Sequence, residues 1–274
     1  MHRQGRGKYK TKRKLYRFLT VMGITFLIGG VLYVWRDVRL QSHVINHAKT
    51  SKVPSNGTHV QESHKVQHTE ALPTAALIDV PPQSQFPQLP TGCEVTSLSM
   101  LFTAIGHPAE KMTLARKEPT DPTKRVLGPN GSIVYWGNPN VGFVGDVYSQ
   151  FNGYGIFHGP IVTLINEILP GRAEDLTGLP FTDILSVVAH GTPVMVWTTA
   201  TFKPTSMWET WNSKEGIVRA TMEEHAVLLV GYDQTQLFIN DPLNGTKAEP
   251  VNRQQFIAAW KQLGKQAVTI KKNT

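Results

Sequence analysis

Apolar positions divide the chain into stretches of different character. Residues 18–35 are uncharged and largely apolar, whereas residues 36–75 are rich in Ser, Thr, His, Lys and Gln and show no sustained apolar period. From residue 76 onward, short apolar runs alternate with helical patterns and with Gly, Pro and Asn. These patterns predict a membrane-spanning segment, a flexible stalk and one globular domain over residues 76–274, all preceded by a basic segment of residues 1–17.

The start of the globular part contains a helix signal. Thr91 and Glu94 have the spacing of a capping box, and apolar residues follow at helical intervals as far as Ile105. Gly106 then provides a stop signal. We therefore expect Cys93 to lie in the first turn of a helix.

Charge sets the expected topology. The formal charge is +8, and residues 1–17 hold eight basic residues and no acidic one, so 20 of the 28 basic residues remain against 20 acidic residues. The chain after residue 17 thus has no excess of basic residues that could bind a phosphate backbone, and nucleic acid is not an expected partner. The apolar segment can cross about 30 Å of hydrocarbon at ~1.5 Å per residue, and the positive-inside rule places the N-terminus in the cytoplasm.

These features predict a single-pass protein of the cell membrane whose globular domain is extracytoplasmic. A cleaved signal peptide is the alternative interpretation. Against cleavage, the apolar segment ends in the bulky residues Tyr33, Val34 and Trp35 and lacks an Ala-x-Ala-like site.

Cys93 is the single cysteine of the chain, which excludes an intramolecular disulfide. Unpaired amides and the dipole at a helix start favour an anion, so we expect them to lower the pKa of the thiol and to raise the fraction of nucleophilic thiolate. The other interpretation is a small apolar residue packed beneath the cap. The choice between the two depends on whether the chain supplies a base.

Four histidines lie outside the proposed membrane segment and stalk, namely His107, His158, His190 and His225. His107 and His190 are expected at turns, and His158, in a glycine-rich loop, remains a substitute candidate. His225 begins an apolar run that extends to residue 232 and is followed, after three polar residues, by a second run over residues 236–241. This arrangement is typical of a β-hairpin.

A three-residue hairpin loop would place Asp241 diagonally across from His225 on the same face of the sheet. Asp241 would then accept a hydrogen bond from Nδ1 of the imidazole and leave Nε2 to take the proton of Cys93. A bulge would bring Asn240 to the histidine instead. A cysteine at a helix start, followed roughly 130 and 150 residues later by His and Asp, is the order expected of papain-type peptidases.

Five segments carry a family resemblance: LPTGCEVTSLSMLFTAIG, GFVGDVYSQFNGYGIF, GTPVMVWTT, EEHAVLLVGYD and FINDPLNG. Over about residues 77–270, the chain resembles the bacterial peptidase family thirty-nine-like domain, a relative of the bacteriocin double-glycine leader peptidases. The resemblance implies an α+β, papain-like cysteine peptidase fold, in which a helix bearing Cys93 packs on an antiparallel sheet bearing His225 and Asp241. It matches these three residues to a catalytic triad.

The resemblance also implies a glutamine upstream of the cysteine that stabilises an oxyanion. Gln85 is the candidate for this role, with Gln83 and Gln88 as alternatives; its side chain and the backbone amide of the cysteine would donate to the oxyanion. Cleavage of leader peptides is not expected, because Glu94 stands where the leader peptidases commonly have glycine and no transporter module is found.

Together, the sequence predicts a membrane-anchored cysteine peptidase that hydrolyses peptide or amide bonds through a thioester. Its expected partners are a peptide or protein substrate, with cell-wall peptide as one candidate, and the cytoplasmic membrane through residues 18–35. No metal or organic cofactor is expected, since the stalk histidines lack the pattern of a metal site. Two alternatives stay open, a peptidoglycan-directed amidase or endopeptidase with the same triad and a non-catalytic papain-like module that binds peptides.

Overall fold

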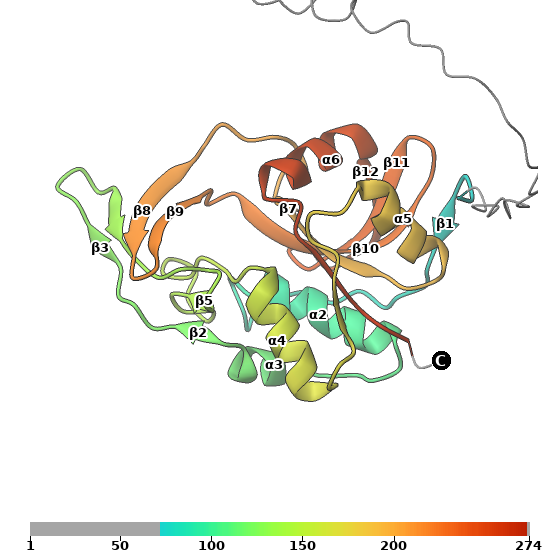
Figure 1. Ribbon diagram of the computed structural model, residues 1–274, viewed down its shortest axis with the longest axis horizontal. Coiled ribbons are helices and arrows are strands. Elements are labelled where there is room, and N and C mark those ends of the chain that lie inside the picture. Colours follow the sequence, from blue (N-terminus) through green and yellow to red (C-terminus); the bar gives the residue numbers. More distant parts are fainter. Residues whose placement is uncertain (1–71, 273–274) are drawn as a thin grey trace, which may run out of the picture. The chain divides into compact units, whose positions relative to one another are not determined.

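The structure, a computed structural model, describes residues 72–272, which form both helices and strands (Figure 1). The helices are α2 (Cys93–Ala104), α3 (Lys111–Lys117), α4 (His158–Ile168), α5 (Phe181–Ala189) and α6 (Arg253–Gln262). The strands are β1 (Ala76–Leu77), β2 (Thr120–Asp121), β3 (Val126–Leu127), β4 (Ile133–Tyr135), β5 (Phe143–Val144), β6 (Ala173–Asp175), β7 (Val194–Thr199), β8 (Glu209–Ser213), β9 (Gly216–Ala220), β10 (Glu224–Tyr232), β11 (Gln236–Asp241), β12 (Thr246–Asn252) and β13 (Ala267–Ile270).

A seven-stranded sheet forms the centre of this region. Its strands follow the order β12-β11-β10-β7-β13-β6, with β1 beside β10, and every pairing is antiparallel. Strand β10 pairs with β11, β7 and β1, and its residues from His225 to Tyr232 are all buried. A continuous apolar run is therefore found in the strand that has neighbours on both edges and helices on both faces.

Helices cover both faces of the central sheet (Figure 1). On one face, α2 and α4 contribute to a core with Ala226, Leu228 and Val230 of β10. On the other face, α5 and α6 contribute to a core with Val227 and Leu229. Because successive side chains of a strand point to opposite faces, one apolar run supplies both cores.

Helix α2 begins where the sequence predicted, but the predicted capping box is wrong. The N-cap residue is Gly92, and no side chain caps the helix. The Thr91 hydroxyl instead contacts backbone oxygens in residues 146–149, and the Glu94 carboxylate accepts a hydrogen bond of 2.8 Å from the backbone N–H of Ile156. Two side chains with the spacing of a local cap therefore join α2 to the segment between β5 and α4.

The hairpin of β10 and β11 has the predicted register in its central part. Leu228 pairs with Asn240, as a three-residue loop requires. A bulge near the turn then places Tyr232 opposite Leu237 rather than opposite Gln236. Because this bulge lies between residue 229 and the turn, the end of the hairpin that holds His225 keeps its register.

A second, smaller core lies beside the sheet β3-β4-β8-β9. The rings of Trp136, Tyr154 and Trp211 pack against one another there, with centroids 5.4 to 6.2 Å apart in tilted or edge-on arrangements. Such aromatic contacts add to the burial of apolar area. They hold Tyr154, and with it the residues that follow toward α4, in a fixed position.

The predicted fold class needs a correction. An α+β fold with the cysteine-bearing helix packed on an antiparallel sheet is present, but within residues 72–272 no helix is both long and apolar enough to cross a membrane. The predicted transmembrane helix of residues 18–35 lies outside the described residues, as do the basic segment of residues 1–17 and almost all of the proposed stalk of residues 36–75. The proposed domain boundaries stay predictions.

Asn240 offers a test of how β11 is tied to the chain before α2. Its buried side chain donates to the backbone oxygen of Val80 and accepts from the backbone N–H of Ala248, both at 2.9 Å. Asn240→Ala leaves both groups without these partners, so we expect the free energy of unfolding to fall by about 1 to 3 kcal/mol. Urea unfolding measures this change, with the exposed Gln234→Ala as control. Equal stability of the two variants would contradict the structural role.

Candidate active site

Cys93 is the first residue of α2 and is almost buried, with 6% of its surface exposed. Gly92 before it has no room for a side chain, because an added Cβ would lie 2.7 Å from the Cβ of Leu89. The helix start is anchored to β10 at one residue: the Ser97 hydroxyl donates to the backbone oxygen of Ala226 at 3.1 Å, and the backbone of the same residue lies close enough to the thiol to lower its pKa. The thiol therefore lies beside the residue that follows His225.

His225 and Asp241 contact each other directly. Nε2 of the imidazole lies 2.7 Å from Oδ1 of Asp241, and both side chains are only 4% exposed. The carboxylate also accepts a hydrogen bond of 2.8 Å from the backbone N–H of Leu243, which fixes its orientation. The predicted pairing of histidine and aspartate is present, but the predicted ring nitrogen is wrong, since Nε2 and not Nδ1 contacts the carboxylate.

Gln85 is buried, whereas its two alternatives are not. The Gln85 side chain is 2% exposed and donates from Nε2 to the backbone oxygen of Pro90 at 2.7 Å, and its backbone N–H donates to Pro242, the neighbour of Asp241. Gln83 is half-buried and donates to Ser99 on α2, and Gln88 is exposed. Of the three glutamines, Gln85 therefore has the most constrained place beside the site.

Of the four predicted residues, His225 and Asp241 are joined by a side-chain hydrogen bond. Gln85 and Cys93 are held nearby through contacts of their segments with the backbone of residues 242 and 226. Within residues 72–272, the thiol of Cys93 donates to Oε2 of Glu94 at 3.3 Å and makes no hydrogen bond to His225. Nδ1 of His225 has no hydrogen-bond partner in the same region. The imidazole therefore keeps one nitrogen available for a proton.

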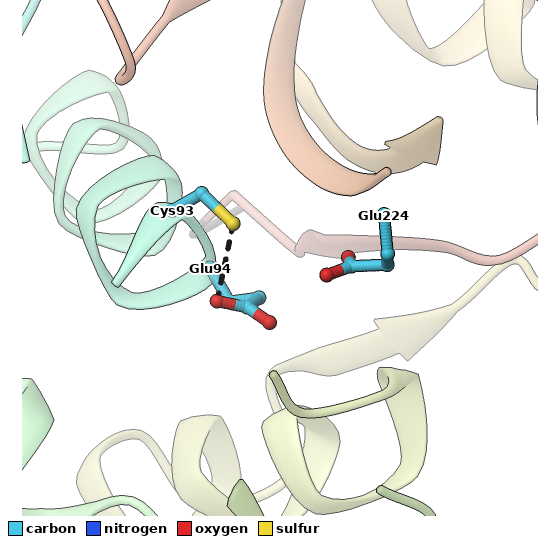
Figure 2. A group of neighbouring side chains, drawn as sticks. All are labelled: Cys93, Glu94 and Glu224. Atoms are coloured by element: carbon cyan, nitrogen blue, oxygen red, sulfur yellow. Dashed lines mark hydrogen bonds between the residues drawn. The ribbon is translucent and has the colours of Figure 1, made fainter. Parts of the chain in front are cut away.

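Two glutamates that the sequence analysis did not assign to the site lie beside the thiol (Figure 2). Oxygens of Glu94, on α2, and of Glu224, at the start of β10, lie within 4.8 Å of each other and of the Cys93 sulfur. Glu94 was interpreted as a capping residue, and Glu224 precedes His225 without any motif of its own. The one signal available for Glu94 was its position: an acidic residue stands second in a helix whose first ten residues are all buried.

These acids change the electrostatics of the site. Burial, followed by the charges of Glu94 and Glu224, raises the pKa of the Cys93 thiol well above its usual value, although the hydrogen bond from Ala226 lowers it. The expectation that the helix start lowers this pKa is therefore wrong. Burial also raises the pKa of Glu94 to about 7, and burial together with the charge of Glu94 raises the pKa of Glu224.

Comparisons with known proteins show which family the chain belongs to. A sequence profile of the Peptidase_C39 like family matches residues 77–268. The chain belongs to this family. It is 34% identical over 263 residues to the uncharacterized protein YvpB of Bacillus subtilis (strain 168), which covers 96% of this chain and all of that protein. The resemblance found in the sequence is thus confirmed.

One solved structure is similar to the Peptidase_C39 like chain in both sequence and fold. A crystal structure described as a C39-like peptidase from Bacillus anthracis is 38% identical, covers 73% of this chain and 98% of its own, and superposes with a TM-score of 0.66. A cysteine protease from Carica candamarcensis covers 74% of this chain and 100% of its own at 11% identity, and its TM-score of 0.38 is too low to carry an argument.

A cavity of about 290 Å³ lies next to the acids of this Peptidase_C39 like domain. Its walls include Tyr154, Trp208 and Arg219, and the guanidinium of Arg219 stacks over the Trp208 ring at 3.9 Å. The pKa of Tyr154, one of the lining residues, is raised by burial and then by the charges of Glu224, Glu94 and Cys93, so this wall of the cavity lies close enough to the acids to feel their charges. The cavity offers room for a substrate group on that side.

The pH dependence of thiol alkylation tests the electrostatics. The rate of reaction of Cys93 with iodoacetamide is expected to titrate above the pKa of about 8.5 of a free cysteine. Glu94→Gln removes a negative charge next to the thiolate and should lower this pKa, whereas the exposed control Glu110→Gln should not. A thiol that titrates at or below 8.5 in the wild type, or that is insensitive to Glu94→Gln, would disprove this account.

Proposed function

We propose that the protein is a cysteine peptidase that hydrolyses peptide or amide bonds through a thioester on Cys93. The buried hydrogen bond between His225 and Asp241, next to the residue that holds the thiol, is the observation on which the proposal rests. Membership of the Peptidase_C39 like family supports it. The substrate is proposed to be a peptide or protein.

Each residue has a defined step in this reaction. His225 takes the thiol proton at Nδ1, and the sulfur of Cys93 attacks the carbonyl carbon of the substrate. His225 then passes the proton to the leaving amine, which departs as the thioester forms. Water, deprotonated by the same imidazole, hydrolyses the thioester and releases the thiol. Asp241, through Nε2, holds the ring and stabilises its protonated form.

Charge that develops on the carbonyl oxygen needs donors in fixed positions. The backbone N–H of Cys93 lies at the first turn of α2, where it has no partner within the helix. Gln85 uses Nε2 to hold the oxygen of Pro90, which leaves the second N–H of its amide for the oxyanion. Two such donors are the usual components of an oxyanion hole.

The raised pKa of the thiol is compatible with this mechanism. A thiol that stays protonated in the free enzyme requires a base at the moment of attack, and the available Nδ1 of His225 meets this requirement. The nucleophile is then produced only where the base and a substrate are both present. This condition protects a buried thiol from unspecific reaction.

Variants of the proposed triad test the activity. With a fluorogenic peptide library as substrate, we expect Cys93→Ala to abolish hydrolysis and His225→Ala to lower kcat/KM by about a hundred- to ten-thousand-fold. His107→Ala, which removes an exposed histidine, is the matched control and should be fully active. Cleavage that persists in Cys93→Ala would refute the thioester mechanism. Parallel digestion of purified peptidoglycan decides whether cell-wall peptide is the substrate.

The three upstream glutamines give a second test. Gln85→Ala should lower kcat by about a hundredfold, because a donor to the oxyanion is lost. Gln88→Ala removes an exposed side chain and should leave kcat unchanged, while Gln83→Ala should affect only the packing against α2. Circular dichroism shows whether each variant is folded. If Gln85→Ala and Gln88→Ala had equal kcat values, Gln85 would have no catalytic role.

A further inference from the structure

The group of Cys93, Glu94 and Glu224 has the donor atoms of a metal site. The sulfur and one oxygen of each carboxylate all lie within 4.8 Å of one another, and the sulfur is 3.3 Å from Oε2 of Glu94. Figure 2 shows the carboxyl group of Glu224 pointing toward the sulfur and toward Glu94. Among residues 72–272, these three form the single group of at least three potential ligands within such distances.

The charges of these acids are not compensated by the surrounding protein. Both oxygens of Glu224 are buried without a hydrogen-bond partner, and the same holds for Glu118, whose pKa is raised by burial and by the charge of Glu94. Within the described residues, the one ion pair that a lysine or arginine makes is that of Lys247 with Asp79. A buried carboxylate without a partner is unfavourable and takes up a proton, which agrees with the raised pKa values of Glu94 and Glu224, so a cation would bind in exchange for these protons.

The hydroxyl of Tyr154 is a further polar group near Cys93, Glu94 and Glu224. Tyr154 is 7% exposed, and among residues 72–272 its hydroxyl makes no hydrogen bond of normal geometry, although the backbone of Thr221 lies close enough to lower its pKa. This hydroxyl lies where the charges of Glu224, Glu94 and Cys93 all act on it. Gly155 follows, and a Cβ there would clash with Oε1 of Glu94 and lie 2.9 Å from Oε2 of Glu224. The two carboxylates therefore pack against the backbone of Gly155, the residue that follows Tyr154.

We propose that Cys93, Glu94 and Glu224 bind a divalent cation of the zinc class through the thiolate and one oxygen of each carboxylate. One sulfur and two oxygen donors suit a borderline-soft ion better than Mg²⁺ or Ca²⁺, which prefer oxygen alone. The backbone N–H of Ile156, 2.8 Å from Oε1 of Glu94, and the hydrogen bond from Ala226 to the thiol orient two of the ligands. Water completes the coordination, and the thiol proton leaves to solvent.

Metal binding would regulate the peptidase, a consequence that rests on the proposed function. An ion on the sulfur of Cys93 occupies the lone pair that attacks the substrate. Zinc would then act as a reversible inhibitor, and a chelator would restore hydrolysis. The binding site itself does not depend on whether the thiol is catalytic.

Cobalt titration of the full chain tests the site through a signal that only one residue can give. Co²⁺ bound to a thiolate has a charge-transfer absorption in the near ultraviolet, and Cys93 is the single cysteine, so histidines elsewhere in the chain cannot produce this band. We expect one Co²⁺ per chain with this band, displaced by Zn²⁺. Glu224→Gln should weaken binding by about tenfold or more, Cys93→Ser should lose the band, and the adjacent control Glu223→Gln should match the wild type.

Two outcomes overturn the proposal: no thiolate band in the wild type, or equal affinity of Glu224→Gln and Glu223→Gln. Circular dichroism of each variant excludes misfolding as the cause. In a second measurement, Zn²⁺ should protect Cys93 from iodoacetamide in His225→Ala as it does in the wild type. If zinc protects Cys93 but the wild type hydrolyses no peptide, the metal site is retained and the peptidase is rejected. If the wild type hydrolyses peptide, zinc does not inhibit it and no cobalt band appears, the peptidase is retained and the metal site is rejected.

Discussion

The contact between the start of α2 and Ala226 of β10 determines the geometry of the whole site. Ser97 donates a hydrogen bond to this residue of the central strand, and the thiol of Cys93, one helical turn earlier, lies near enough to its backbone for the pKa of the thiol to be lowered. The contact holds Cys93, the proposed nucleophile, near His225, although 131 residues lie between these two positions in the chain. Burial of α2 between β10 and the segment before α4 makes this docking rigid.

Opposing electrostatic effects meet at the thiol, and their magnitudes decide the outcome. A helix start stabilises a nearby anion by about 0.3 to 1 kcal/mol when exposed, which is less than one pKa unit of about 1.4 kcal/mol. Removal of a charge from water costs several kcal/mol. Burial therefore dominates, and the nearby Glu94 and Glu224 add to it. The site favours a protonated Cys93, so the proposed mechanism needs a base, and the proposed metal site needs the ion, to produce the thiolate.

The sequence was informative where local spacing determines structure. Periodic apolar residues predicted α2, and two apolar runs separated by three polar residues predicted the hairpin that brings His225 to Asp241. Spacing was misleading where a polar side chain has distant partners: Glu94 has the position of a cap residue but binds Ile156, 62 residues away. Neither the pairing of β8 with β4 nor the approach of Glu224 to the thiol has a local signal, because both arise from tertiary packing.

Acylation of Cys93 by a simple activated ester is the most direct measurement of the central claim. Intact-mass spectrometry after brief exposure to p-nitrophenyl acetate counts acyl groups on the chain, and peptide mapping locates them. The account predicts one acyl group on Cys93, formed faster than on the unfolded chain and slowed in His225→Ala. Acylation at the same rate in the folded and unfolded chains, or no effect of His225→Ala, would contradict a nucleophile activated by this histidine.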